Sequence, residues 1–430
     1  MMRPKVNAVV LAGTHQDPRR LVHGQNKALL PINHRPLLGH VIDALRAAPS
    51  IASIMIVGPA DLIRQHLPDL SSDIAVIPQG SSLVENAWRG FMAVAADAEQ
   101  SSGSALRSGP QGPAMEMMEQ IDPVDHLLAD IAAAVADTDS GVISVQTAQV
   151  ILAKHLRRSF RLDGFRSRIS GARLERLFWE HSAINIAAGH IRFSTDDLFA
   201  AYLQLHNWLN ESVLFVPGDI PLVTPEAIED FLLRCGTYEQ DFYFGIVKEE
   251  DLTAYYPRGQ TPGVIRPYVH LREARVRIFN LVLAKPKLIA RAWLVKSGFD
   301  FRKMVHWSNV VQVARVLAGL RGRFWGLYYL SVLQLAAICR RNGLERLALR
   351  IARACPLYGL EFHLSRLLGT DFQLVLTPFG GPAIDVDNAE DYAIIQQNFD
   401  GWLAFQAECA RETGQACLPI VRPSAKLPGY

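Results

Sequence analysis

Two aspartates and a lysine, far apart in the chain, have the residue types that metal-assisted phosphate chemistry uses. Asp219 follows an apolar run, Asp387 lies in the acidic stretch DVDNAED, and Lys27 follows a polar loop near the N-terminus. Mg²⁺ prefers hard oxygen ligands and takes one or two protein carboxylates, leaving its other positions to water and substrate phosphates. A lysine supplies a point charge to phosphate oxygens. Together these residues predict metal-assisted transfer of a nucleotidyl group.

Asp219 is expected at the C-terminal end of a strand, between Gly218 and Ile220, where the chain turns sharply. That edge of an open α/β sheet is where ligands bind. The alternative role is capping of the following helix, although Thr224 before Pro225 already supplies a cap. We therefore favour a functional role for this carboxylate.

The second acidic position is expected within another strand. We expect Asp385 and Asp387 to lie on opposite sides of it. Only one of the two carboxylates can then point at a shared site.

The N-terminal segment VLAGTHQDPRRLVHGQNKALLPI stops an apolar strand at Gly13 and resumes apolar sequence after Lys27. A glycine at that turn lets backbone N–H groups approach a triphosphate without an intervening side chain. The polar loop would then fold over the phosphates and deliver the lysine. The alternative is an ordinary surface loop with a solvated lysine.

Apolar runs alternate with helical patterns along the chain, which predicts an α/β fold with a mostly parallel, Rossmann-like sheet covered by helices. A Ser-, Gly- and Pro-rich stretch at 99–115 is expected to be a mobile loop, followed by mainly helical sequence to residue 210. The expected strands are 6–11, 51–59, 73–80, the run from 212, DFYFGIV, RIFNLVLAKP and FQLVLTP. The expected helices are 37–48, 82–96, the one after Thr224 and those within 302–368, and residues 383–399 are expected to be a strand running into a helix.

The composition excludes several classes of protein. The chain has 430 residues, 49% of them hydrophobic, and a formal net charge of +2, so it has no signature of nucleic-acid binding. Five cysteines without a CxxC pair favour neither a disulfide framework nor a zinc site, and a cytoplasmic location is expected. The apolar stretch 324–339 is too short to span a membrane. Its flanking arginines leave a buried helix and a peripheral membrane contact as alternatives.

The segment VNAVVLAGTHQDPRRLVHGQNKALLPINHRPLLGHVI resembles the opening motif of the NTP transferase superfamily, which has a GT-A-like, Rossmann-related fold. This superfamily contains molybdenum-cofactor guanylyltransferase-like proteins and sugar-1-phosphate nucleotidyltransferases. VPGDIPLVTPEAI is similar to the family's metal-binding strand end, and AIDVDNAEDYAII resembles its closing acidic motif. The chain departs from the pattern at Thr14, which replaces a second glycine, and in the loop that follows.

The resemblance implies a role for each matching residue. Asp219 and Asp387, rather than Asp385, would hold Mg²⁺, and these two with Lys27 would be catalytic. PQGSSLVENAWRGF would hold the base. The implied nucleotide-binding residues are Leu11, Ala12, Gly13, Arg20, Lys27, Gly80, Ser81 and Asn86.

The resemblance also implies a nucleotidyltransferase core made of residues 1–98, 211–290 and 370–400. Residues 99–210 would be an insertion, 300–368 a helical subdomain and 401–430 a C-terminal tail. The implied substrates are an NTP, CTP or GTP, and a phosphorylated small-molecule acceptor. Arg277 and Asn280 are secondary candidates for contacting that acceptor, with an ordinary edge strand as the alternative.

Two other functions stay open at this point. A GT-A glycosyltransferase would use a nucleotide sugar, and the N-terminal lysine loop argues against it. A catalytically silent nucleotide-binding or membrane-associated protein is suggested by the altered glycine loop and the arginine-rich helical segments.

Overall fold

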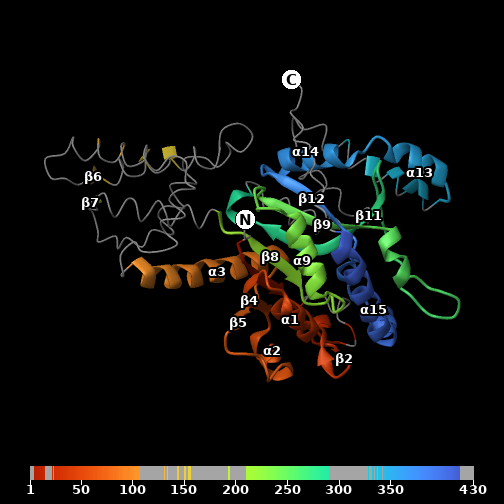
Figure 1. Cartoon of the computed structure of the whole chain (residues 1–430), viewed down its shortest axis with the longest axis horizontal. Helices are drawn as coiled ribbons and strands as arrows, with labels where there is room; N and C mark the ends of the chain where they lie inside the picture. Colours follow the sequence, from red (N-terminus) through yellow and green to blue (C-terminus); the bar gives the residue numbers. More distant parts are fainter. Residues whose placement is uncertain are drawn as a thin grey trace.

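The computed structural model describes residues 4–14, 22, 24–106, 210–289 and 342–416, with single positions between these ranges. Its centre is an eight-stranded sheet in the order β12-β9-β11-β8-β1-β4-β5, with β10 pairing on β11 (Figure 1). The strands are β1 (Val6–Leu11), β4 (Ile51–Gly58), β5 (Ala75–Pro78), β8 (Val213–Pro217), β9 (Phe242–Lys248), β10 (Val269–His270), β11 (Arg275–Ala284) and β12 (Phe372–Thr377).

The sheet is mostly parallel, as predicted. Strands β5, β4, β1, β8, β9 and β12 run in one direction, and β11 runs antiparallel between β8 and β9. The strand order reverses beside β1, because the chain proceeds outward to β4 and β5 on one side and then continues in β8 on the other. In α/β sheets such a switch point opens a crevice at the carboxyl ends of the strands.

Both faces of the sheet are covered, which explains why β1 is apolar from Ala8 to Leu11. Ala8 and Val10 belong to the main core with residues of α1 and α9. Val9 faces α3 on the other side: a Cβ added to Gly90 of α3 would lie 2.3 Å from Val9 Cγ1. Glycine at residue 90 therefore lets the helix approach the strand closely.

Helix α9 (Pro225–Arg234) begins where the sequence places a cap. Thr224 Oγ1 accepts a hydrogen bond from Ala227 N (3.3 Å), and Pro225 opens the helix, as predicted. The described helices are α1 (Leu37–Ala47), α2 (Ala60–His66), α3 (Leu83–Leu106), α9 (Pro225–Arg234), α13 (Glu345–Ala352), α14 (Leu357–Leu368) and α15 (Ala389–Ala416). Short 3-10 turns are η2 (Lys27–Leu29), η4 (Glu250–Tyr255), η5 (Pro286–Leu288) and η7 (Gly381–Ala383), and the two-residue strands β2 (Pro31–Ile32), β3 (Arg35–Pro36), β6 (Ile143–Ser144) and β7 (Arg192–Phe193) form two separate pairs.

The expected loop at 99–115 is wrong in its first part. Helix α3 continues through Leu106. A lone glycine costs a helix only about 1 kcal/mol, so Gly103 does not end it, and the first proline comes at Pro110. Most of the expected insertion and of the 290–327 region lies outside the described residues. Where the expected helical region 302–368 is described, α13 and α14 confirm it.

Candidate functional site

The carboxyl ends of β1 and β8 meet at the switch point of the sheet (Figure 1). Gly218 N donates a hydrogen bond to Leu11 O (2.9 Å). A Cβ at Gly218 would lie 3.2 Å from the Cβ atoms of both Ala12 and Ala28. The glycine before Asp219 thus lets the end of β8 pack against the two N-terminal segments that flank the polar loop.

Asn26 holds the turn that carries Lys27. Its Nδ2 donates to Ala12 O (2.8 Å) and to Thr14 Oγ1 (3.0 Å), and its Oδ1 accepts from Ala28 N (3.0 Å). Asn26 is buried and caps η2, so it ties the end of β1 directly to the lysine turn. Asn26 was not predicted, although an asparagine just before Lys-Ala-Leu is a typical cap.

Three of the predicted nucleotide-binding residues, Gly13, Gly80 and Asn86, lie together. A Cβ at Gly13 would be 2.6 Å from Asn86 Nδ2, so only glycine leaves that amide in place. Asn86 is buried, and its Oδ1 accepts from Gly80 N (2.6 Å). Gln79, also missed, accepts from Thr14 N through Oε1 (2.6 Å). Side-chain amides therefore fix the backbone on this side of the site.

Ser81 is exposed at the start of the same turn, and its donors are already used. Glu85 Oε2 accepts from both Ser81 N and Ser81 Oγ, at 2.7 Å each. The two hydrogen bonds from Ser81, followed by that from Arg89, lower the pKa of Glu85 to about 2. These two hydrogen bonds hold Ser81 in the turn that precedes α3.

Lys27 and Asp387 come together from opposite ends of the sequence. Lys27 Nζ lies 3.7 Å from Asp387 Oδ1. The side chain of Lys27 is 18% exposed and that of Asp387 44%, so the pair is at the surface of the site and open to solvent on the aspartate side.

Asp219 joins this pair at the end of β8. Its backbone O accepts a hydrogen bond from Val386 N (3.1 Å), which sets residues 384–387 alongside the strand end. Desolvation, followed by the charge of Asp385, raises the pKa of Asp219 to about 7. The charge of Lys27 lowers that pKa and the charge of Asp387 raises it. The four charged groups therefore act on one another across a single site.

The predicted strand at Asp385 and Asp387 is wrong. Residues 384–387 pair with no described strand and lead from η7 into α15. The two carboxylates do not face opposite sides, because Arg266 reaches both. Its Nε lies 3.8 Å from Asp385 Oδ1 and its Nη1 3.2 Å from Asp387 Oδ2. The expectation of opposite sides is wrong for a strand as well, because residues two apart along a strand lie on the same face.

Arg266 also binds a third carboxylate, since its Nη2 lies 2.8 Å from Asp391 Oδ2. The Arg266 side chain is only 9% exposed. Asp391 in turn accepts from Asp387 N (3.2 Å) and from Asn388 Nδ2 (3.0 Å), at the start of α15. Arg266 was not predicted, because nothing in its local sequence distinguishes it from other arginines.

Arg277 and Asn280 hold the same acidic segment from β11. Arg277 donates to Ala383 O and to Asp385 Oδ1, at 2.9 Å each. Asn280 Nδ2 donates to Pro382 O (2.9 Å). Asn280 has a φ of +67° at the point where the register of β11 on β9 shifts. Their predicted contact with an acceptor stays a prediction, and Arg20 lies outside the described residues.

The donor set at the meeting point is compatible with Mg²⁺. Asp219 and Asp387 offer carboxylate oxygens, which are the hard ligands this cation takes. Among the residues that the structure describes, no group of three or more His, Cys, Asp or Glu side chains is placed to hold a metal ion. Mg²⁺ leaves its other positions to water and substrate phosphates.

Residues 8–108 match the family model of the MobA-like NTP transferase domain. This confirms the resemblance to the NTP transferase superfamily over the N-terminal part of the chain, and with it an enzyme of the nucleotidyltransferase class. No curated protein sequence matches the chain.

Several solved structures are similar in fold. A hypothetical transferase from Thermus thermophilus is 20% identical, with a TM-score of 0.42, over 91% of this chain and 99% of that one. 4-Diphosphocytidyl-2C-methyl-D-erythritol synthase from Anaerococcus prevotii is 11% identical, with a TM-score of 0.30, over 68% and 76%. A CMP:2-keto-3-deoxy-manno-octonic acid synthetase complexed with CTP is 9% identical, with a TM-score of 0.33, over 92% and 99%.

Proposed function

We propose that the chain is a Mg²⁺-dependent nucleotidyltransferase that moves a nucleoside monophosphate from CTP or GTP to a phosphorylated small-molecule acceptor. The observation that carries this proposal is the meeting of Lys27, which lies in the segment that matches the NTP transferase domain, with Asp387 and Asp219. Pyrophosphate is the second product.

The chemistry needs no protein nucleophile. A phosphate oxygen of the acceptor attacks the α-phosphorus of the NTP in line, and the bond from that phosphorus to the bridging oxygen of the β-phosphate breaks. Bound Mg²⁺ would neutralise charge on the phosphates and orient them. Asp219 and Asp387 are the residues that would hold it.

The chain's own contribution is positioning and charge. Gly13 keeps the backbone after β1 accessible, and it is exposed at the surface. Lys27 sits on a turn fixed by Asn26, so its ammonium is placed before substrate arrives. A triphosphate would draw Lys27 away from Asp387, because a phosphate and that carboxylate compete for the same cation.

The direct test is pyrophosphate release from each NTP with a panel of sugar, polyol and cofactor phosphates. We expect release with CTP or GTP, dependent on Mg²⁺, and a loss of about 10²- to 10³-fold in kcat for Lys27→Ala. Lys5→Ala is the matched control, since Lys5 is exposed just before β1, at the opposite end of that strand. Unchanged release by Lys27→Ala would contradict the assignment.

The two alternatives give different results in the same assay. Hydrolysis or transfer from nucleotide sugars, without release of pyrophosphate from an NTP, would indicate a glycosyltransferase. Binding of an NTP in calorimetry without any turnover would indicate a silent nucleotide-binding protein.

A further inference from the structure

Large apolar side chains are exposed together on α13 and α14. Leu347 and Leu349 of α13 are 45% and 50% exposed, and Leu344 just before that helix is 52% exposed. Tyr358 and Phe362 of α14 are 69% and 40% exposed. More than half of the large apolar side chains exposed in the described part of the chain lie between residues 328 and 362. The α13–α14 face is defined here as Leu344, Leu347, Leu349, Tyr358 and Phe362, together with Arg346 and Arg350.

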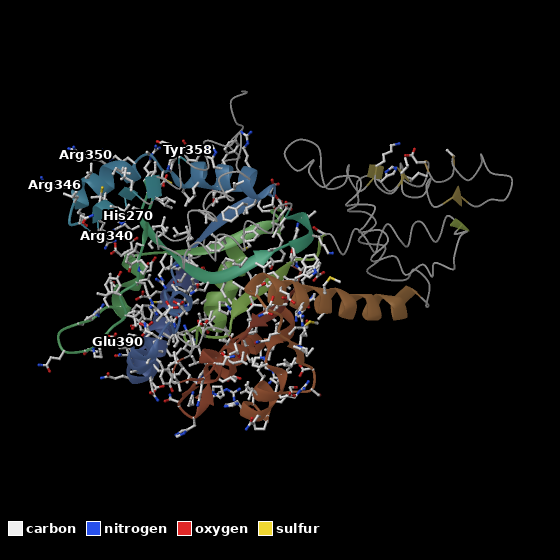
Figure 2. The ribbon with its side chains drawn as sticks, turned by 180° about the vertical axis from the view of Figure 1, so that it is seen from behind. His270, Arg340, Arg346, Arg350, Tyr358 and Glu390 are labelled. Carbon is white, nitrogen blue, oxygen red and sulfur yellow. The ribbon has the colours of Figure 1, made fainter. Side chains whose placement is uncertain are left out.

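The helical period explains how this face is built. Ala348 and Ala352 of α13 are buried against the body of the molecule. At 100° per residue, Arg346 and Arg350 lie on the opposite, outward side of the helix, with Leu347 and Leu349 on either side of them. Figure 2 shows the two arginines at the outer edge of the molecule, on the side of the sheet where Tyr358 lies.

Three exposed arginines, Arg346, Arg350 and Arg353, give the face a positive charge. Glu345 is paired with Arg275 (Oε1 to Nη1, 3.5 Å), whereas Glu361, whose Oε1 accepts from Leu374 N (2.8 Å), keeps its negative charge. Within the described residues, Arg346 and Arg350 have no carboxylate partner, and both are exposed.

We propose that the α13–α14 face docks on a membrane surface rich in anionic lipid. Leucine, tyrosine and phenylalanine side chains bind at the boundary of headgroups and acyl chains, and arginines between them meet lipid phosphates. The apolar side chains are dispersed among cations on an outward helix face. A fluid bilayer fits that pattern, since it needs no matching pocket for each side chain.

This contact would be peripheral. In the part of the chain that the structure describes, no helix has the length and apolar character needed to cross a bilayer. The proposal is independent of the proposed catalysis, because none of its residues lies in the candidate site.

The experiment is flotation of the full chain with vesicles of phosphatidylcholine alone and of phosphatidylcholine containing phosphatidylglycerol. We expect the protein to float with the anionic vesicles at low salt and to be released as salt rises. Arg346→Glu/Arg350→Glu should reduce the bound fraction at limiting lipid about tenfold or more. Leu347→Ser/Leu349→Ser should also reduce it, with less dependence on salt.

The matched control is Arg64→Glu/Arg411→Glu, which changes the net charge equally at exposed positions on α2 and α15. Circular dichroism and thermal unfolding establish that each variant is folded. Failure to float with anionic vesicles overturns the proposal, as does equal loss in the control variant. Concentration-dependent self-association that the face variants abolish, without vesicle binding, would instead assign the face to a second copy of the chain.

Discussion

The two sides of the candidate site are held by different kinds of bond. On the N-terminal side, the neutral amides of Asn26, Gln79 and Asn86 bind backbone groups. On the other side, Arg266 and Arg277 bind carboxylates and the backbone that carries them. Neutral hydrogen bonds fix a shape at any pH or salt concentration, whereas an ionic network responds to both. The difference suggests that one side sets geometry and the other sets charge.

The largest effect is expected from removing the centre of the ionic side. Arg266→Ala leaves three carboxylates without the guanidinium that contacts them, and breaking such a buried pair costs about 3 kcal/mol. Urea unfolding measures this loss of stability. Arg266→Lys should rescue little, since one ammonium cannot reach three partners. Arg258→Ala is the control, because Arg258 is exposed and its side chain donates to a backbone carbonyl, Thr253 O (3.3 Å).

Removing an amide from the neutral side should cost less stability than Arg266→Ala, and the loss should not depend on salt concentration. Asn26→Ala removes the cap of η2 and leaves Ala12 O without its side-chain donor, which we expect to cost about 2 kcal/mol. The unfolding free energies of Asn26→Ala and Arg266→Ala, measured against the wild type at low and high salt, test the comparison. Equal salt dependence of the two losses would show that the two sides do not differ as described.

The pH dependence of stability should come from Asp219. Its pKa of about 7 in the folded chain lies above the ordinary value of 3.8, so the folded state binds this proton more tightly than the unfolded state does. That contribution is present at low pH and is lost as the pH rises from about 4 through 7. In metal-free buffer, Asp219→Asn should therefore gain on the order of 2 kcal/mol over the wild type by pH 8.

Thermal unfolding from pH 5 to pH 8 measures this gain as a rise in Tm. Asp61→Asn, an exposed position on α2, is the control and should change nothing. A parallel course of the wild type and Asp219→Asn across this range would show that the aspartate is not desolvated.

The smallest effect is expected at Gly13. A Cβ there meets Asn86 Nδ2 at 2.6 Å, so Gly13→Ala must turn the amide away from Gly80 N, at a cost of about 1 kcal/mol. Gly401→Ala in α15 is the control: nothing lies within 4 Å of the added Cβ, and the helix should gain up to about 1 kcal/mol. Urea unfolding distinguishes the two signs.

The backbone frame of the site was predictable from the sequence. The apolar residues 8–12 and 213–217 are followed by Gly13 and Gly218, and parallel strands place those ends at one edge. This rule brings Gly13 and Asp219 into one neighbourhood. Lys27 meets Asp387 at this edge of the sheet, because the segment before α15 is hydrogen-bonded to Asp219 at the end of β8.

What could not be predicted depends on contacts between distant segments. Buried Ile384 and Val386 alternate with the less buried Asp385 and Asp387, and this alternation is the sequence pattern of a strand. The backbone of that segment bonds instead to the end of β8. The role of Arg266 could not be predicted either, because its three partners follow more than a hundred residues later and no local sequence pattern distinguishes it.

The hydrogen bond from Val386 N to Asp219 O has a consequence for biosynthesis. While the ribosome is still making the chain, the strand ends at Gly13 and Gly218 can form, but the second half of the site does not yet exist. A product that stops before residue 386 would contain Lys27 and Asp219 but would lack Asp387 and Asp391. Premature termination would then yield a fragment without a complete site.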